Sequence, residues 1–410
     1  MINFDDALPL VLAAGNQLPA REIPITEVVG RILADDIYAP VNLPPYDKAT
    51  IDGFALFSDD AKDTKAIHEV IGVAQAGTFP ERQLERGQAM QIQAEAPLPD
   101  GSDTVVPMNG VRLLMNGSRV GMLDRVRRGK NIVGAGDIVK KGDRILKAGT
   151  CLSAVDVGLL SAVGFAKVKV IMPPRVGIAA MGNEFIEPGK QIAQGQVWDP
   201  IGIHLLTGLY EMKVQPEYLG MMAENEKAIL QKISQALSCN ILIMTGMSGA
   251  FRKKLLMDVF NKVGAHILFD GISLAPCGSV TLAKLENMLI FVLPVNPFFC
   301  LIFYEIIITP LLRKMMGFQN IYHTVIEAIL KKKLRKTLEY HLIYPGILYF
   351  EKNRYFVAPC ESLTKLDIFS YARCNCLLSL GKNIKSIKRG KEVPVILTKN
   401  LGEVRQRDEK

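Results

Sequence analysis

The spacing of apolar residues changes along the chain, and each change marks a different kind of secondary structure. In residues 3–20 apolar positions recur at helical spacing after an acidic start, which predicts an amphipathic helix. The stretch 22–150 has short apolar segments between many Gly and Pro turns, for example at 66–73, 89–93 and 103–107. This stretch therefore predicts a β-rich region without a long helix.

Beyond residue 152, compact apolar runs alternate with amphipathic segments. The runs show no in-out alternation, which is typical of parallel strands covered on both faces; they are residues 176–180, 241–244 and 289–293. Helical spacing is found at 203–212, 223–237 and 255–263. After Gly317 a β-type alternation returns at 342–350, 354–357 and 393–398, which predicts a small C-terminal β unit.

A chain of 410 residues is too long for one ordinary core. We expect an α/β plus β fold with a central mixed or parallel α/β domain between a β-rich N-terminal lobe and a small C-terminal β domain. The expected boundaries are 1–21 with 136–172 for a linker or helical domain, 22–135 for the lobe, 173–319 for the α/β domain and 320–410 for the C-terminal domain.

The most hydrophobic stretch, residues 288–304, is about as long as the shortest membrane span. Two prolines and Asn296 interrupt it, so a buried strand, a tight turn and a buried helix explain it better, and we expect no membrane partner. The start of the chain lacks the basic segment of a signal peptide, and the seven cysteines lack zinc spacing. Both observations favour a cytoplasmic location.

Positive charge is concentrated in the last part of the chain. The net charge is +8: residues 313–410, with 20 basic and 9 acidic side chains, carry +11, and the rest of the chain carries −3. Such a region could meet nucleic acid, an acidic partner or a phosphorylated ligand. The basic clusters at 331–336 and 385–391 lack interleaved aromatic residues, so a solvated face is the favoured interpretation and no nucleic acid is expected.

The acidic segment 44–55 is a first candidate for chemistry. It places Asp47 and Asp52 between a pair of prolines and Gly53. The prolines disfavour regular structure, and the glycine allows close approach next to Asp52. The segment suits a metal ion or a polar anionic ligand, although a surface turn uses the same residue types.

The ends of the three apolar runs are a second candidate. They lead into Met181-Gly182-Asn183-Glu184, Thr245-Gly246-Met247-Ser248-Gly249 and Pro294-Val295-Asn296-Pro297. Open parallel sheets bind ligands at the carboxyl ends of their strands, and backbone N–H groups of Gly-rich turns hold phosphate. Because no P-loop or dinucleotide motif is present, these loops predict a different phosphate-bearing ligand.

These segments resemble, in order, the motifs of the molybdopterin molybdenumtransferase family, which includes the gephyrin E-domain. The similar stretches are 44–55, 96–107, 176–184, 195–199 and 293–297. The resemblance implies an elongated multidomain homodimer with a molybdopterin-binding domain. It also implies molybdenum insertion from molybdate into adenylylated molybdopterin, with release of AMP, Mg²⁺ as cofactor and molybdopterin adenylyltransferase as the substrate donor.

The resemblance also implies roles for individual residues. Asp52 and Glu184 would be catalytic and would bind the metal, although Glu184 could instead be only a helix-capping acid. The substrate would contact Gly53, Gly182, Asp199, Gly246, Ser248, Pro294, Asn296 and Pro297.

Other positions depart from the family pattern. Lys254 stands where the family has an aspartate, and Ala275 and Gly278 stand where it has lysines. Loss of such cations weakens phosphate binding, and a lysine near a metal site repels the metal. An alternative is therefore a catalytically impaired homologue that serves as a binding or scaffold protein in the same pathway.

Overall fold

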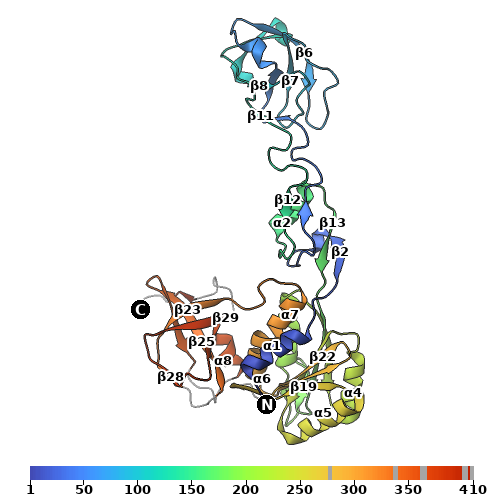
Figure 1. Ribbon diagram of the computed structural model, residues 1–410, viewed down its shortest axis with the longest axis vertical. Helices are drawn as coiled ribbons and strands as arrows, with labels where there is room; N and C mark the ends of the chain where they lie inside the picture. Colours follow the sequence, from blue (N-terminus) through green and yellow to red (C-terminus); the bar gives the residue numbers. More distant parts are fainter. Residues whose placement is uncertain (276–278, 336–339, 361–366, 399–404, 407–410) are drawn as a thin grey trace.

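The computed structural model describes residues 1–275, 279–335, 340–360, 367–398 and 405–406. Figure 1 shows a β lobe at one end of a long molecule, a slender connecting region, and an α/β domain beside a C-terminal β domain at the other end. The expected fold class, α/β plus β in an elongated multidomain chain, is confirmed.

The lobe is built on a six-stranded sheet in the order β8-β5-β7-β6-β10-β9. Its strands are Gly53–Leu56 (β5), Ile67–Ala74 (β6), Gln88–Ile92 (β7), Thr104–Pro107 (β8), Val111–Leu114 (β9) and Arg119–Met122 (β10). Three short 3₁₀ turns join them, Ser58–Ala61 (η2), Met108–Gly110 (η3) and Met115–Gly117 (η4). Phe54 and Ala55 belong to separate apolar clusters on opposite faces, so the central strand β5 is covered on both sides.

Two-stranded ribbons and one helix form the connecting region. The pairs are Ala20–Pro24 (β2) with Lys167–Ile171 (β13) and Ile37–Tyr38 (β3) with Arg144–Leu146 (β12). A third pair, Lys48–Ala49 (β4) with Ile132–Val133 (β11), lies against the lobe, where Ala49 and Ile132 join one of its apolar clusters. A 3₁₀ turn, Ile25–Glu27 (η1), follows β2. Ser153 and Asp156 form a reciprocal capping box at the start of helix Ala154–Ala162 (α2), which satisfies two free N–H groups.

The α/β domain has the sheet order β17-β14-β18-β22-β21-β19. Strands Arg175–Met181 (β14), Gln215–Met222 (β17), Ile241–Met247 (β18) and Met288–Pro294 (β22) are parallel, whereas Thr281–Leu285 (β21) is antiparallel to β22 and to His266–Asp270 (β19). Consecutive residues of β18, Leu242 and Ile243, lie in two different cores. The apolar runs are thus buried on both faces, as expected.

Helices cover both faces of this sheet. They are Ile201–Glu211 (α3), Glu226–Gln235 (α4), Gly249–Val263 (α5), Pro297–Phe303 (α6) and Thr309–Met315 (α7), with a π-helical turn Tyr304–Ile308 (η5) between the last two. A small ribbon of Phe185–Ile186 (β15) and Val197–Trp198 (β16) lies beyond β14. Residues 288–304 form β22, a turn and α6, and no helix in the described ranges is long and apolar enough to cross a membrane.

The sheet of the C-terminal domain includes strands from distant parts of the chain. Its path is β1-β20-β25-β26-β23-β29-β27, with β30 also paired to β25. The strands are Ile2–Asn3 (β1), Ile272–Ala275 (β20), Val325–Leu330 (β23), His341–Glu351 (β25), Arg354–Pro359 (β26), Cys376–Leu380 (β27), Glu392–Leu397 (β29) and Arg405–Gln406 (β30). Leu334–Arg335 (β24) pairs with Ser386–Ile387 (β28), and Ile368–Arg373 (α8) precedes β27.

The first helix, Phe4–Ala14 (α1), lies against the α/β domain. Its buried residues Ala7 and Val11 share a core with Leu311 and Met315 of α7. The apolar spacing predicted this helix, but we expected residues 1–21 to group with 136–172. Helix α1 packs against a different domain from the expected one, because the spacing of apolar residues identifies the apolar face of a helix but not the surface that covers it.

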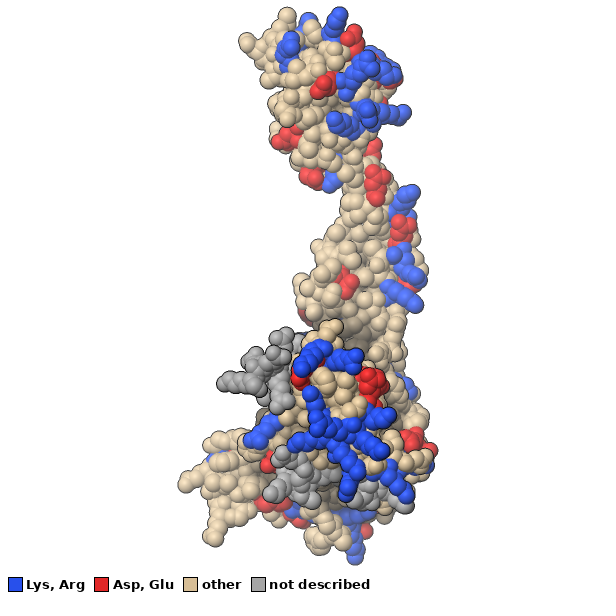
Figure 2. All heavy atoms as spheres, turned by 90° about the vertical axis from the view of Figure 1, so that its left-hand side faces the viewer, with Lys and Arg blue, Asp and Glu red and all other residues tan. Residues whose placement is uncertain are grey.

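Basic side chains gather on the face that the C-terminal domain presents in Figure 2. Residues 331–335 and 382–391 carry nine lysines and arginines and no acid, and the β24–β28 pairing places the two segments side by side. The concentration of charge in the last part of the sequence is therefore a concentration in space as well.

Candidate functional site

The three strand-end loops meet at one edge of the central sheet. Strands β14, β18 and β22 are consecutive parallel neighbours, with Ala180 opposite Thr245 and Met247 opposite Pro294. The N–H of Val295 donates to the carbonyl of Met247 at 2.9 Å, which joins the second loop to the third. The structure thus brings together the loops that carry Gly182, Gly246, Ser248, Pro294, Asn296 and Pro297.

Two glycines at this edge have a positive φ, and at Gly246 the neighbouring backbone is also too close for any side chain. Gly246 has a φ of +93°, and a Cβ there would lie 1.9 Å from the carbonyl oxygen of Met181. Gly182 has a φ of +150°, and a Cβ there would lie 2.6 Å from Oε2 of Glu184. Only glycine fits these positions, so the backbone itself forms this part of the edge.

Asn296 and Pro297 start a helix. Oδ1 of Asn296 accepts a hydrogen bond from the N–H of Phe298 at 2.9 Å, and Pro297 occupies the first turn of α6. Ser248, in contrast, is exposed at the start of α5 and its hydroxyl makes no capping bond. A free hydroxyl at the start of a 15-residue helix suits an anionic group.

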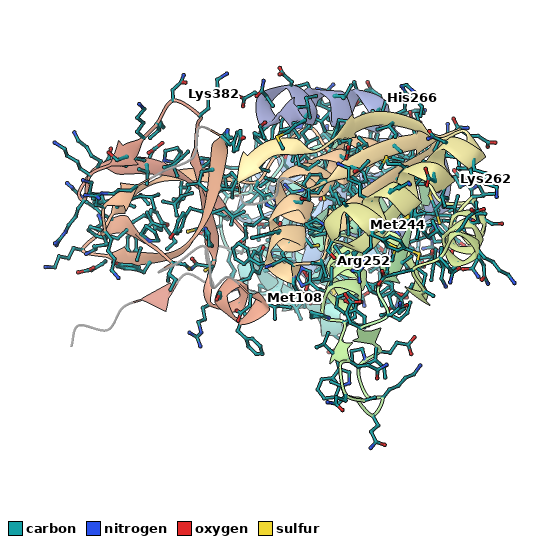
Figure 3. All side chains as sticks on the ribbon, turned by 90° about the horizontal axis from the view of Figure 1, so that it is seen from below. Met108, Met244, Arg252, Lys262, His266 and Lys382 are labelled. Atoms are coloured by element: carbon teal, nitrogen blue, oxygen red, sulfur yellow. The ribbon has the colours of Figure 1, made fainter. Side chains whose placement is uncertain are left out.

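Arg252, which the sequence did not identify, holds the acidic residues of this edge. Its Nη2 donates to both carboxylate oxygens of Glu184, at 2.9 and 2.8 Å, and to Oε1 of Glu224 at 2.5 Å. Its Nη1 donates to the carbonyl of Gly246 at 2.7 Å. Figure 3 shows Arg252 near the start of α5, with Lys262 toward the other end.

The ion pair of Arg252 with Glu224 shifts the pKa of both groups. The hydrogen bond from Arg252 lowers the pKa of Glu224, and burial opposes the shift. The hydrogen bond to Glu224 raises the pKa of Arg252, so the guanidinium stays charged at every pH of interest. The sequence places Arg252 one helical turn after Ser248, which was a signal that it lies near the strand-end loop. Its partner Glu224 lies 28 residues away, and residue spacing cannot show that contact.

Asp199 is buried and organises the start of α3. Its carboxylate accepts hydrogen bonds from the N–H groups of Ile201 at 2.9 Å and Gly202 at 3.1 Å. Burial raises the pKa of Asp199, and these two bonds oppose the shift. Burial, followed by the nearby charge of Asp199, raises the pKa of Tyr218 to about 12. The contacts made by Asp199 are those of a capping residue.

Asp52 directly precedes β5 of the lobe, whereas Glu184 follows β14 of the α/β domain, and these two domains lie at opposite ends of the molecule (Figure 1). It is exposed, and its Oδ1 accepts a hydrogen bond from the N–H of Ala94 at 2.8 Å. A Cβ on Gly53 would lie 2.1 Å from the carbonyl oxygen of Val106, so this glycine allows the close pairing of β5 with β8. One chain therefore does not bring the two expected metal ligands together.

The donor set of a single chain does not fit Mg²⁺. Arg252 occupies both carboxylate oxygens of Glu184, and the described residues contain no group of three or more His, Cys, Asp or Glu side chains placed to hold a metal ion. Lys254 is exposed on α5, Ala275 ends β20, and Gly278 lies outside the described residues.

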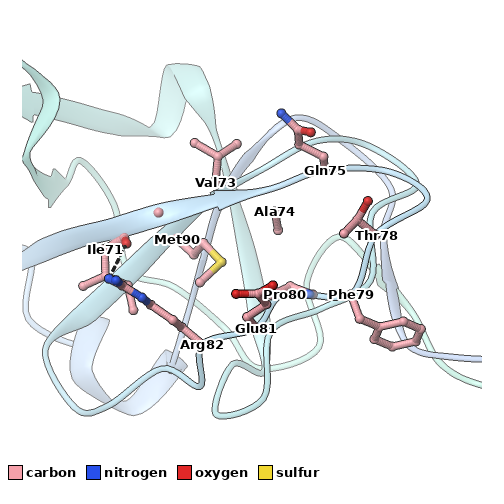
Figure 4. Close-up of a pocket in the computed structure, with 11 residues that line it drawn as sticks. Ile71, Val73, Ala74, Gln75, Thr78, Phe79, Pro80, Glu81, Arg82 and Met90 are labelled. Carbon is pink, nitrogen blue, oxygen red and sulfur yellow. Dashed lines mark hydrogen bonds between the residues drawn. The ribbon is translucent and has the colours of Figure 1, made fainter.

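A separate cavity of about 280 Å³ lies in the lobe (Figure 4). Phe79, Arg82 and Met90 are among its lining residues, and Nη1 of Arg82 donates to the carbonyl of Ile71 at 3.4 Å. None of the expected site residues lines this cavity.

The architecture is that of a multidomain protein whose α/β domain presents Gly- and Pro-containing loops at one sheet edge. Residues 2–164 match the family "MoeA N-terminal region (domain I and II)", and residues 177–314 match "Probable molybdopterin binding domain". The chain belongs to the MoeA family.

Individual relatives are similar over almost their whole length. The molybdopterin molybdenumtransferase of Bacillus subtilis is 25% identical over 403 residues, which is 97% of this chain and 94% of the relative. That of Haemophilus influenzae is 27% identical over 407 residues, 96% and 98% of the two chains. The crystal structure of the molybdopterin biosynthesis MoeA protein from Pyrococcus horikosii has a TM-score of 0.86 and 25% identity, covering 98% of this chain and 100% of that one.

Proposed function

We propose that this chain is a molybdopterin molybdenumtransferase, which inserts molybdenum from molybdate into adenylylated molybdopterin and releases AMP. The observation that carries the proposal is the meeting of three loops, after β14, β18 and β22, at one edge of a domain that matches a molybdopterin-binding family. The relatives of that name cover nearly the full chain.

The chain's own residues supply contacts for an anionic substrate. Gly182 and Gly246 keep side chains away from the sheet edge, and Ser248 offers a free hydroxyl at the positive end of α5. Asn296 and Pro297 fix the third loop, and buried Asp199 fixes the start of α3. Together they orient a phosphate-bearing ligand and keep backbone donors directed toward it.

Asp52 is the proposed general base. It is exposed, and it keeps a carboxylate oxygen other than the one bonded to Ala94 available. Because Asp52 belongs to the lobe and Glu184 to the α/β domain at the other end of the molecule, they can share a site only if a second copy supplies one of them. We therefore propose a homodimer in which Asp52 of one protomer faces the sheet edge of its partner.

The substrate donor, the cellular location and the partners of the protein are also proposals. Substrate would arrive from a molybdopterin adenylyltransferase in the cytoplasm, without nucleic acid or membrane. Mg²⁺ was expected from the resemblance, but the donor set of one chain does not fit it, so no step is assigned to it.

A scaffold without turnover is the second candidate, because Lys254, on α5, stands where the resemblance implies an aspartate. The experiment that separates the two is complementation of a bacterial strain lacking this activity, followed by assay of a molybdoenzyme. Rescue by the wild type and loss of rescue by Asp52→Asn support the enzyme. Expression of folded protein without rescue contradicts it.

A further inference from the structure

Arg252 forms a compact ionic cluster with two carboxylates that are far apart in the sequence. One nitrogen, Nη2, lies 2.8 Å from Oε2 of Glu184 and 2.5 Å from Oε1 of Glu224. The side chain of Arg252 is only 11% exposed, and those of Glu184 and Glu224 are 32% and 16% exposed. The guanidinium is therefore enclosed by its partners.

A second contact fixes the cluster to the sheet edge. Nη1 of Arg252 donates to the carbonyl of Gly246, the residue whose missing side chain allows β18 to approach Met181. The N–H of Asn183 donates to Oε1 of Glu224 at 3.4 Å, from the loop that carries Glu184. The cation thus ties together the ends of β14, β17 and β18.

Two carboxylates that converge on one point repel each other unless a cation lies between them. Proteins supply that cation either as a bound metal, which takes oxygen ligands of this kind, or as a side chain. Here a side chain fills the position, since the same guanidinium binds both oxygens of Glu184 and one of Glu224. A metal ion could use these oxygens only by displacing Arg252.

We infer that Arg252 is a built-in cation that takes the place of a divalent metal between Glu184 and Glu224, so that this sheet edge keeps its shape without metal. Removal of the charge of Arg252 should convert the two carboxylates into a cation site. The inference concerns metal binding and does not depend on the proposed activity.

The chain offers a matched control at the next position. Among the described residues, Lys253 pairs with a single carboxylate, that of Asp270, at 2.7 Å, and its side chain is 48% exposed. Loss of Lys253 leaves the carboxylate of Asp270 alone, which is too few ligands for Mg²⁺ or Mn²⁺. Lys253→Gln should therefore not change metal binding.

The experiment measures binding of Mn²⁺ alone, by electron paramagnetic resonance, to the purified full chain. We expect Arg252→Gln to bind Mn²⁺ more tightly than the wild type by about tenfold or more, the scale on which neighbours of a ligand set alter metal affinity. Arg252→Lys, which keeps a positive charge, should behave like the wild type. Adding Glu184→Gln to Arg252→Gln should abolish the gain.

Two outcomes would overturn the inference. One is an Arg252→Gln variant that folds, by circular dichroism, and gains no affinity for Mn²⁺. The other needs no Arg252 variant: it is weaker Mn²⁺ binding by the single variant Glu184→Gln than by the wild type. Such a result would mean that Glu184 binds metal while Arg252 is in place. If Arg252→Gln does not fold, equal Mn²⁺ binding by the wild type and Glu184→Gln supports the inference.

Discussion

At the scale of single residues, the acidic side chains expected in the site have three different environments. Asp52 is exposed with one backbone donor, Glu184 is held by a guanidinium, and Asp199 is buried against two backbone N–H groups. An exposed carboxylate stays available for proton transfer, whereas a carboxylate held by partners serves mainly to fix geometry. Only Asp52 therefore combines the expected chemistry with free access.

Replacement of Asp52 by asparagine should lower the rate of molybdenum insertion by about 100-fold, a typical general-base contribution. Asparagine can still accept the hydrogen bond from Ala94, and the side chain is exposed, so the melting temperature should stay nearly unchanged. The measurement is specific activity together with thermal unfolding. A variant with normal activity and lower melting temperature would make Asp52 a structural residue.

His68 makes the lobe sensitive to acid. It is 1% exposed, its Nδ1 has no hydrogen-bond partner in the described part of the chain, and burial lowers its pKa while the charge of Asp60 opposes the shift. The unfolded chain therefore binds a proton at a higher pH than the folded chain does. Stability should be complete above the unfolded pKa of about 6.5 and should fall as the pH drops toward the lower folded value.

His68→Leu should remove this part of the pH dependence and leave the lobe more stable under acid. Hydrogen exchange of the β6 amides between pH 7 and pH 5, corrected for intrinsic rates, measures the effect. Equal acid sensitivity in the wild type and the variant would show that His68 is not the group responsible.

Residue types in the loops could be predicted from the sequence, but their contacts could not. The positions of Gly182, Gly246 and Asn296 follow from motif and strand end, because special backbone geometry needs special residues. The role of Arg252 depends on Glu224, which lies at the end of another strand. No local pattern contains a contact of that kind.

At the scale of elements, the junction of β14 and β18 is the part of the site most dependent on one residue. Gly246→Ala should destabilise the α/β domain by roughly 3 kcal/mol or more, because the added Cβ would overlap the carbonyl of Met181 at a positive φ. Fluorescence of Trp198, the only tryptophan and a residue of β16 in the same domain, reports denaturant unfolding.

Gly249→Ala is the matched control for this substitution. Gly249 also has a positive φ, +68°, but a Cβ there would meet nothing within 4 Å. The control should cost only about 1 kcal/mol, the penalty of the left-handed conformation. Equal losses in the two variants would remove the close approach as the cause.

Strong periodicity predicted the elements of the α/β domain well, including α4, β18 and β22, because buried strands and amphipathic helices have distinct patterns. Short strands were harder to predict from the sequence. β1, which starts at Ile2, and β20, which starts at Ile272, complete the sheet of the C-terminal domain although they are far from it in the sequence. Only tertiary pairing makes these segments strands. The same reason explains the unexpected position of α1.

At the scale of the whole molecule, the distance between the lobe and the α/β domain determines how a complete site can form (Figure 1). If two copies build each site, a mixture of Asp52→Ala and Glu184→Gln chains should be more active than either variant alone. Random assembly makes half of the dimers mixed, each with one intact site, so activity should recover to about a quarter of the wild type. Co-expression of two differently tagged variants allows this assay.

Two results would contradict shared sites. Light scattering that shows only a 45.2 kDa monomer at micromolar concentration would exclude the dimer. Mixed dimers with no activity above the separate variants would exclude exchange of Asp52 between protomers.

We propose that molybdenum insertion takes place at this sheet edge. The most direct test incubates the purified chain with adenylylated molybdopterin and molybdate, and follows AMP release together with formation of a cofactor that activates a cofactor-free molybdoenzyme. We expect both products to form in equal amounts and Asp52→Asn to reduce both. Tight binding of the substrate without AMP release or active cofactor would contradict it and would make the chain a scaffold.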